Sequence, residues 1–443
     1  MVDILPFRGV RYDPAAAGAG LADLVAPPYD VILPEEQAAL YDRHPANVVR
    51  LILGREEDRY ARAARLFREW LDSGVLKADD VPALYVYRQT FQDPTTGAPA
   101  PERVGLVCLL KLEEYGTGRV LPHEKTLTAA KADRLELLRA TEAQFESIYG
   151  LYPDPDRAIE SFLREYDDRE TVIERVDGLL GSTHRIERLT DESGHATLRA
   201  LLADAPVFIA DGHHRYETAL NYRREVRSAA GGDVPLAADY ILITLTAFED
   251  EGLLVLPTHR LVRNVTPEKV SGLAEALSPL FTLSESSLET VESAIADHAR
   301  AGRVAFGVVL PPHTVHLAVL NASLDDAAAL VSGPGSEAAK RLPVTLLGHL
   351  ILDRCLGIDA ALVADGEHVS YTRAPSEAVT AVVRGEAQAA FLLGRPTVAE
   401  VKDVSLAGDV MPQKSTFFFP KLLSGLVLRD LRDGVGEVPD ADA

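Results

Sequence analysis

The amino-acid sequence predicts a mixed α/β (α+β) fold divided into more than one domain, and three observations support this. At 443 residues, the chain is too long for one hydrophobic core. Hydrophobic residues make up 47% of it and charged residues 25%, which is typical of a folded globular protein. Short apolar stretches rich in β-forming residues alternate along the chain with stretches whose apolar residues recur at helical spacing.

We expect four parts in order along the chain. These are an N-terminal region (residues 1–115), a central core segment with most of the unusual polar residues (116–247), a C-terminal α/β region (248–430) and an acidic, disordered tail (431–443). The tail is expected to be disordered because "DGVGEVPDADA" offers few apolar side chains to bury.

In the N-terminal region we expect a helix from about Asp58 to Ser73, because Gly74 is suited to end it. The stretches "ALYVYRQTF" and "RVGLVCLLKL" predict two strands of a hairpin, since "QDPTTGAP" between them is rich in turn residues.

In the core segment we expect a helix from about Ala129 to Phe145, followed by a break at "YPDPD". A short apolar strand, Val207–Ala210, then leads into a helix whose first apolar positions are Tyr216, Ala219 and Leu220.

The C-terminal region is expected to alternate helices and strands. Helices are predicted near Pro267–Leu277 and Leu288–Ala301, with strands at "RVAFGVVLP" and "TVHLAVL". Further on, "AQAAFLLG" predicts a buried strand and "RPTVAEVKDVSL" a helix with Pro396 near its first turn, while "FFFP" predicts another strand.

Charge and composition exclude several function classes. The formal net charge is −22, from 67 acidic and 45 basic residues, and so acidic a surface repels nucleic-acid backbones and anionic membranes. Only Cys108 and Cys355 are present, which excludes a disulfide framework or a cysteine zinc cluster. No signal peptide and no apolar stretch of membrane-spanning length is visible, so we expect a soluble cytoplasmic protein.

The stretch "VFIADGHHRYETAL" carries the strongest chemical signal. Asp211, Gly212, His213, His214 and Arg215 follow one another where a strand gives way to a helix. A helix N-terminus offers backbone N–H groups and a positive dipole end to a phosphate, a glycine lets the ligand approach the backbone, and an arginine can bind two phosphate oxygens. Asp211 can handle a proton or a metal ion. The structural alternative is that Asp211 caps the helix and the histidines form a solvated turn.

A third polar segment, "MPQKSTFFFP", lies near the C-terminus. Lys414, Ser415 and Thr416 form a compact donor set, although the glycine-rich lead of a Walker motif is missing. A phosphate-rich ligand on so acidic a chain needs local positive charge, so we expect Lys125 and Lys414 to supplement Arg215. We therefore expect Lys414–Thr416 to fold back to the "DGHHR" turn, the alternative being a solvated turn lysine before a strand.

These motifs resemble known families. "DGHHR" after a strand resembles the signature box of the ParB/sulfiredoxin-like fold, and it matches the box of its free serine kinases at all five positions. "RVLPHEKTL" is similar to the Pro-His-Glu segment of those kinases, in which the glutamate acts as general base on the substrate hydroxyl. The order of segments from "PFRGVRY" through "PPYDV", "HEKTL" and "DGHHRYETAL" to "MPQKST" resembles the bacterial and archaeal family called domain of unknown function 1015. The resemblance implies a central ParB/sulfiredoxin-like unit.

The function implied is phosphoryl transfer from a nucleotide to the hydroxyl of a small metabolite, with free L-serine giving O-phosphoserine as the leading case. The expected catalytic residues are Glu124, Asp211 and His213. The residues expected to bind phosphate or nucleotide are Gly212, His214, Arg215, Lys125, Thr126, Lys414, Ser415 and Thr416. Residues with a substrate-binding or structural role are His123, Tyr29, Asp30, His259 and Arg260. Glu124 is expected within one small-substrate width of Asp211.

The expected cofactor is Mg²⁺ with ATP or ADP, with Asp211 as a candidate Mg²⁺ ligand. Two alternatives stay open. A metal-dependent hydrolase could use Asp211, His213, His214 and Glu124 as ligands, and a non-catalytic nucleotide sensor could use the same phosphate site without transfer. The oligomeric state and the choice between the two donors do not follow from the sequence.

Overall fold

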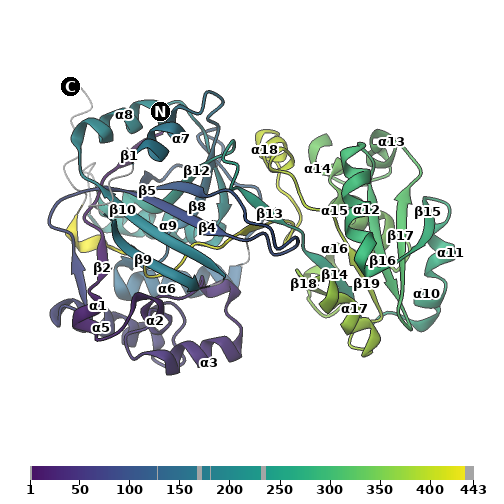
Figure 1. Ribbon diagram of the computed structural model, residues 1–443, viewed down its shortest axis with the longest axis horizontal. Helices are drawn as coiled ribbons and strands as arrows, with labels where there is room; N and C mark the ends of the chain where they lie inside the picture. The colour runs from purple at the N-terminus through teal and green to yellow at the C-terminus, as the bar shows by residue number, and fades with distance from the viewer. Residues whose placement is uncertain (1, 127, 167–171, 180, 231–235, 435–443) are drawn as a thin grey trace. The chain divides into compact units, whose positions relative to one another are not determined.

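A computed structural model describes residues 2–126, 128–166, 172–179, 181–230 and 236–434 (Figure 1). The fold is mixed α/β, as predicted. The chain divides into two compact units. The first unit contains Met1–Pro122, Thr126–Leu254 and Pro420–Ala443, and the second contains His123–Lys125 and Val255–Phe419. Within the described ranges, no helix has the length and apolar character needed to span a membrane.

The first unit is built on one large sheet, in which the order of strands is β6-β11-β8-β12-β5-β4-β10-β9, with β1 pairing alongside β5. The strands are β1 Ile4–Leu5, β4 Leu84–Phe91, β5 Arg103–Lys111, β6 Val120–Leu121, β8 Ile148–Tyr152, β9 Val172–Leu179, β10 Ser182–Leu189, β11 Val207–Asp211 and β12 Tyr240–Ala247. The pairs β6–β11 and β8–β12 are parallel, and the other pairs are antiparallel. The predicted β4–β5 hairpin is confirmed.

This sheet unites two of the parts that we expected to be separate. β5 of the N-terminal region pairs along its length with β12 of the core segment, from Tyr240–Lys111 to Leu245–Leu106. Because that pairing buries a continuous apolar surface, residues 1–115 and 116–247 belong to one unit and no boundary falls between them.

Helices pack on this sheet through apolar residues at helical spacing. The helices of the first unit are α1 Pro14–Ala17, α2 Leu21–Leu24, α3 Pro34–Arg43, α4 Val49–Ile52, α5 Arg59–Asp72, α6 Thr128–Thr141, α7 Ala158–Glu165, α8 Glu192–Leu202 and α9 His213–Ala230. The predicted helix α5 is confirmed, and it is followed by Gly74 with φ of 77°. Small pairs complete the unit: β2 Val10–Tyr12 with β3 Leu76–Ala78, and β7 Ala143–Gln144 with β21 Arg429–Asp430.

Helix α6 ends four residues before the expected Phe145. Glu142 has a positive φ of 48°, and the next two residues form β7, which pairs with Arg429 and Asp430. The apolar ring of Phe145 packs edge-on against Phe67, with 5.1 Å between the ring centroids, although Phe145 is not part of the helix. Tertiary pairing therefore ends the helix where the local apolar spacing would continue it.

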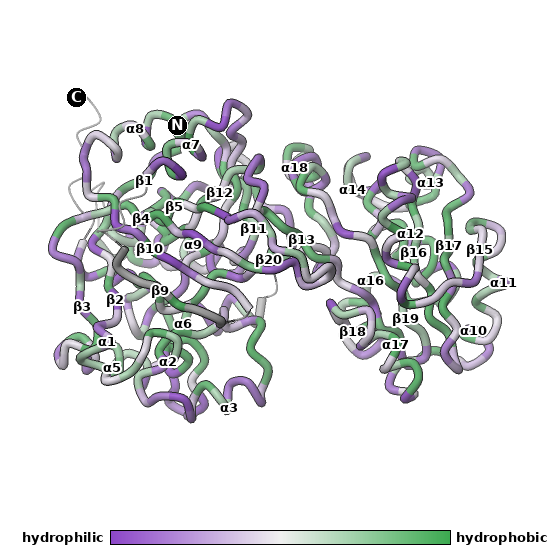
Figure 2. Tube along the Cα trace, viewed as in Figure 1, coloured by the Kyte–Doolittle hydropathy of each residue, from purple (hydrophilic) through white to green (hydrophobic). Residues whose placement is uncertain are grey.

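The second unit contains an antiparallel sheet with the order β15-β17-β16-β19-β14-β18. Its strands are β14 His259–Val262, β15 Phe281–Ser286, β16 Ala305–Leu310, β17 Thr314–Leu320, β18 Val369–Thr372 and β19 Ala389–Leu392. Alternate residues of these strands enter two cores, one on each face, as in Phe306 and Val308 against Ala305 and Val309. Figure 2 shows the apolar residues running along the strands within each unit.

The helices of the second unit cover both faces of its sheet, with α12 and α17 on one face. They are α10 Pro267–Ser271, α11 Leu273–Leu277, α12 Leu288–Arg300, α13 Leu324–Ala329, α14 Glu337–Arg341, α15 Pro343–Leu346, a π-helix at Leu347–Asp353, α16 Ala360–Ala364, α17 Pro375–Val383 and α18 Val398–Leu406. A short pair, β13 Leu254–Leu256 with β20 Phe417–Phe419, completes the strands, and β20 confirms the strand predicted at "FFFP".

Two local expectations in the C-terminal part need correction. The helix predicted at Pro267–Leu277 is two helices that meet at Gly272. Pro396 lies near the first turn of α18, as expected, directly before the N-cap Thr397. The start of the predicted tail, Leu431–Asp433, is a 3₁₀ helix with Leu431 buried, and residues 435–443 lie outside the described part of the chain.

The C-terminal segment from Pro420 to Asp430 runs through the first unit. It is buried almost throughout, and its backbone pairs with Ala26 through Ser424 and with Val10 through Leu428. This segment contributes to the candidate site described next.

Candidate functional site

The "DGHHR" segment forms the predicted junction between β11 and α9. Gly212 has φ of 90°, and its carbonyl accepts the first helical hydrogen bond from Tyr216 N at 3.0 Å. A Cβ atom at position 212 would lie 2.8 Å from Cγ2 of Ile148, which is fully buried in β8. Only glycine therefore fits this turn without strain, both for its backbone angle and for its space.

Asp211 is bound on both carboxylate oxygens. Its Oδ2 accepts a hydrogen bond from Lys421 Nζ at 2.8 Å, and its Oδ1 accepts one from Gly212 N at 2.9 Å. Burial alone would raise the pKa of Asp211, but the charges of Lys421 and Arg215 outweigh burial and hold the pKa well below its usual range. Asp211 is thus an ionised group that binds Lys421 and interacts with the charge of Arg215, and it is a poor general base at neutral pH.

Arg215 is partly exposed and lies beside this ion pair. Its Nη1 donates to Ser147 O at 2.9 Å, while its Nε is buried and has no hydrogen-bond acceptor among the described residues. Burial would lower the pKa of Arg215, but the nearby carboxylates of Glu146 and Asp211 raise it above its ordinary value. The guanidinium therefore stays charged.

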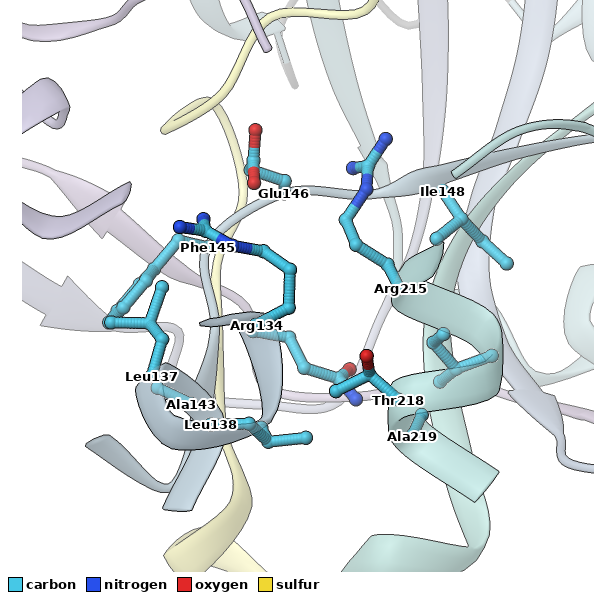
Figure 3. A pocket seen from close by; sticks show the side chains of 12 residues that line it. Arg134, Leu137, Leu138, Ala143, Phe145, Glu146, Ile148, Arg215, Thr218 and Ala219 are labelled. Carbon is cyan, nitrogen blue, oxygen red and sulfur yellow. The ribbon is translucent and has the colours of Figure 1, made fainter. Parts of the chain in front are cut away.

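A cavity of about 60 Å³ lies against the first turns of α9 (Figure 3). Arg215, Glu146 and Arg134 line it together with apolar side chains of α6, α9 and β8. The guanidinium of Arg134 stacks on the ring of Tyr29 at 4.1 Å, and Glu146 Oε1 accepts hydrogen bonds from Tyr29 N at 3.1 Å and Ser424 Oγ at 2.9 Å.

The "PPYD" segment therefore belongs to the surroundings of Arg215. Burial raises the pKa of Tyr29, so its phenol is neutral. Asp30 is exposed, and its charge acts on both Tyr29 and Arg215. His213 is buried at the start of α9, and His214 is partly exposed next to it.

A second polar cluster lies in the second unit and is centred on His123. This histidine is 1% exposed, its Nε2 is 2.9 Å from Thr416 Oγ1, and its carbonyl accepts a hydrogen bond from Met411 N at 2.7 Å. Ser415 is buried and donates to Pro412 O. The "HEK" and "MPQKST" segments, which lie almost 300 residues apart, are therefore in direct contact.

Arg260 joins the same cluster. Its Nη2 donates to Lys414 O at 3.3 Å and its guanidinium lies 5.4 Å from the centroid of the Tyr371 ring. Burial lowers the pKa of Arg260 to about 10, and the charges of Tyr371 and Glu124 partly offset this. Lys125 and the side chain of Lys414 are exposed, and Lys414 has a positive φ of 57°.

Two predicted residues have contacts of another kind. Thr126 belongs to the first unit, where its Oγ1 donates to Glu217 of α9 at 2.8 Å. His259 is fully buried; its Nδ1 accepts a hydrogen bond from Leu393 N at 3.2 Å, and burial, together with the charge of Arg260, lowers its pKa to about 4. His259 is therefore neutral at physiological pH, and its hydrogen bond joins β14 to the residue that follows β19.

The structure thus groups the predicted residues into two sets. In the first unit the "DGHHR" turn lies with Tyr29 and Asp30, and in the second unit the "HEK" segment lies with Arg260 and the Lys414–Thr416 segment. The expectations that Glu124 and Lys414–Thr416 approach the "DGHHR" turn join residues of different units, and they stay predictions.

Sequence reasoning did not identify Lys421, Glu146, Arg134 or Ser424 as parts of the site. Two of them had a recognisable signal. Lys421 stands alone in the apolar stretch "FFFPKLLSGLVL", and Glu146 follows the apolar Phe145 just before a buried strand. A single charge in such a stretch is expected to be buried and therefore paired.

The donor set at Asp211 does not form a metal site by itself. Both of its oxygens accept hydrogen bonds, one of them from a lysine, which supplies the compensating positive charge. Among the residues that the structure describes, there is no group of three His, Cys, Asp or Glu side chains that could hold a metal ion.

Comparisons with known proteins identify the family. No functionally curated protein matches the chain. Similar solved structures include a conserved hypothetical protein from Pyrococcus furiosus, with 15% identity, a TM-score of 0.34, and coverage of 71% of this chain and 93% of that one. A free serine kinase in complex with AMP has 13% identity and a TM-score of 0.35, covering 68% and 83% of the two chains. SbnI with a C-terminal truncation, from Staphylococcus aureus, has 9% identity and a TM-score of 0.32, covering 72% and 86%. The model of the family described as protein of unknown function (DUF1015) matches residues 4–345, and the chain belongs to this family.

Proposed function

We propose that this protein is a small-molecule kinase that transfers a phosphoryl group from ATP or ADP to a metabolite hydroxyl, with free L-serine as the leading acceptor. One observation carries the proposal. A glycine with positive φ opens the 18-residue helix α9, directly beside the partly exposed Arg215 and the buried Lys421. The "DGHHR" and "PHE" motifs add the resemblance to free serine kinases, and a ParB/sulfiredoxin-like core is part of the same proposal.

The junction has the properties that phosphate binding requires. The first N–H groups of an α-helix have no intrahelical partner, and they lie at the positive end of the helix dipole. Gly212 has no side chain to keep a ligand away from these groups. Arg215, whose buried Nε has no acceptor among the described residues, adds fixed positive charge. Charge-assisted hydrogen bonds of this kind are about twice as strong as neutral ones.

Glu124 is assigned the role of general base that takes the proton from the acceptor hydroxyl. The charge of Glu124 acts on the buried Arg260 and on Tyr371, and a carboxylate at this place could accept a proton from a hydroxyl. A carboxylate of ordinary basicity is a weak base for an alcohol, so positioning and charge neutralisation would provide most of the rate enhancement.

Mg²⁺ would arrive with the nucleotide and neutralise charge on its phosphates. Asp211 is assigned a different task, because its Oδ2 already binds Lys421 and its Oδ1 binds Gly212 N. Its role is to orient the cations at the start of α9.

The proposal is tested by following the ³¹P NMR signal of O-phosphoserine when the purified chain is incubated with L-serine, Mg²⁺ and either ATP or ADP. Wild type should form phosphoserine from at least one donor. Glu124→Gln should lose transfer but retain nucleotide affinity, whereas Glu136→Gln, on exposed α6 surface, should behave as wild type. Nucleotide binding without transfer in wild type would favour a nucleotide sensor, and no nucleotide binding would refute the kinase.

A further inference from the structure

The start of the C-terminal segment, residues 420–424, contributes the charged residue Lys421 to the first unit. Lys421 has a side chain only 10% exposed, and its partner Asp211 has one 19% exposed. A lysine ammonium this far from water is costly unless it is paired. The pairing distance of 2.8 Å shows that the position of Lys421 is specific.

Polar side chains of the large sheet hold the backbone on either side of Lys421. Arg103, which is 1% exposed, donates to the carbonyl of Pro420 and to Gln89 Oε1. Gln89 Nε2 in turn donates to the carbonyl of Lys421 at 3.2 Å. Because Gln89 and Arg103 come from the hairpin strands β4 and β5, the rigid centre of the sheet sets where Lys421 lies.

The same segment reaches the other side of Arg215. Ser424 Oγ donates to Glu146 Oε1 at 2.9 Å, and Glu146 is the carboxylate whose charge acts most strongly on Arg215. The segment therefore binds both Glu146 and Asp211, the two carboxylates that act most strongly on Arg215.

Two cations, Lys421 and Arg215, lie together at this place among carboxylates. Asp211 faces both Lys421 and Arg215, and these two cations together hold its pKa well below its usual range. The buried Nε of Arg215 has no acceptor among the described residues. Lys421 brings an ammonium, with three donor hydrogens, to the residue that directly precedes the Gly212 turn.

We propose that Lys421 is a phosphate-binding residue of this site, which the C-terminal segment delivers to the start of α9. This rests on the proposed function, since it takes the ligand to be a nucleoside di- or triphosphate. Without ligand the ammonium binds Asp211, and with ligand it also donates to a phosphate oxygen. Lys421 lies outside residues 4–345, which the family model matches, so the family match does not include it.

The test measures ADP binding to the full chain by isothermal titration calorimetry. Lys421→Met should weaken binding about 10–100-fold, the range expected for a lost hydrogen bond to a charged group, while Lys421→Arg should recover most of it. Lys111→Met removes a half-exposed lysine of the same unit and should leave affinity unchanged.

A structural role for Lys421 predicts a different pattern. Lys421→Met alone leaves the Asp211 charge unpaired, so lost stability could weaken binding indirectly. The comparison is therefore repeated between Asp211→Asn and the double variant Asp211→Asn/Lys421→Met, where no carboxylate needs neutralising. A further loss of 10-fold or more in the double variant supports phosphate contact, and equal affinities overturn it. If wild type binds neither ADP nor ATP, the proposed function fails as well.

Discussion

Replacing Gly212 with alanine tests whether the β11–α9 turn has the conformation that phosphate binding needs. Two costs add. A side chain at φ of 90° costs about 1–2 kcal/mol for any residue with a Cβ. The new Cβ would also lie 2.8 Å and 3.0 Å from atoms of Ile148, a fully buried residue of the central sheet that cannot move aside. Overpacking of this kind costs about 1–3 kcal/mol, which gives roughly 2–5 kcal/mol in total.

Gly116→Ala is a matched control in the same unit. Gly116 has φ of 93°, and a Cβ built there has nothing within 4 Å, so this variant reports the backbone cost alone. Urea unfolding of both variants, analysed by linear extrapolation of the first unit's transition, should show Gly212→Ala less stable than Gly116→Ala by about 1–3 kcal/mol. Equal destabilisation of the two would refute the close packing of this turn against β8.

Three further predictions follow from the charges and exposures. Because the pKa of Asp211 is lowered in the folded chain, its stabilising effect is present above its unfolded pKa of about 4 and is lost below it; acid unfolding followed by circular dichroism should be less steep below pH 4 in Asp211→Asn. Folding lowers the pKa of His259 from 6.5 to about 4, so the free energy of unfolding of the second unit should fall by on the order of 3 kcal/mol between pH 6.5 and pH 4. Urea titrations at both pH values should show this fall in wild type and its absence in His259→Gln. Lys414→Ala removes an exposed side chain, so it should leave the thermal midpoint within about 1 °C yet weaken ADP binding several-fold; unchanged affinity would remove Lys414 from the site.

Local pattern predicted much of this architecture. The hairpin β4–β5, helix α5 and the β11–α9 junction were expected because their apolar periodicity and turn residues lie within a few positions of one another. The place of Gly212 at a helix N-terminus was expected from the same short stretch, whereas its φ of 90° comes from the structure.

Long-range pairing accounts for what the sequence did not predict. Lys421 binds Asp211, which lies 210 residues earlier in the chain, and β5 pairs with β12, which lies more than 100 residues later. No local pattern in the sequence shows which residues form these pairs. Such contacts decided that the N-terminal hairpin and the core segment share one sheet, and that the C-terminal segment returns to the first unit. The lone charges of Lys421 and Glu146 beside apolar residues indicated only that each is buried and paired, and did not identify the partner.

Hydrogen–deuterium exchange with mass spectrometry, with and without ADP, tests the central claim most directly, because it locates bound nucleotide without assuming that transfer occurs. Peptides that cover Asp211–Tyr216 at the start of α9 should exchange more slowly when ADP is bound, since a phosphate would accept hydrogen bonds from amides of the first helical turn. Saturating ADP with no protection there, or with protection confined to other segments, would contradict the assignment of the "DGHHR" turn as the phosphate site.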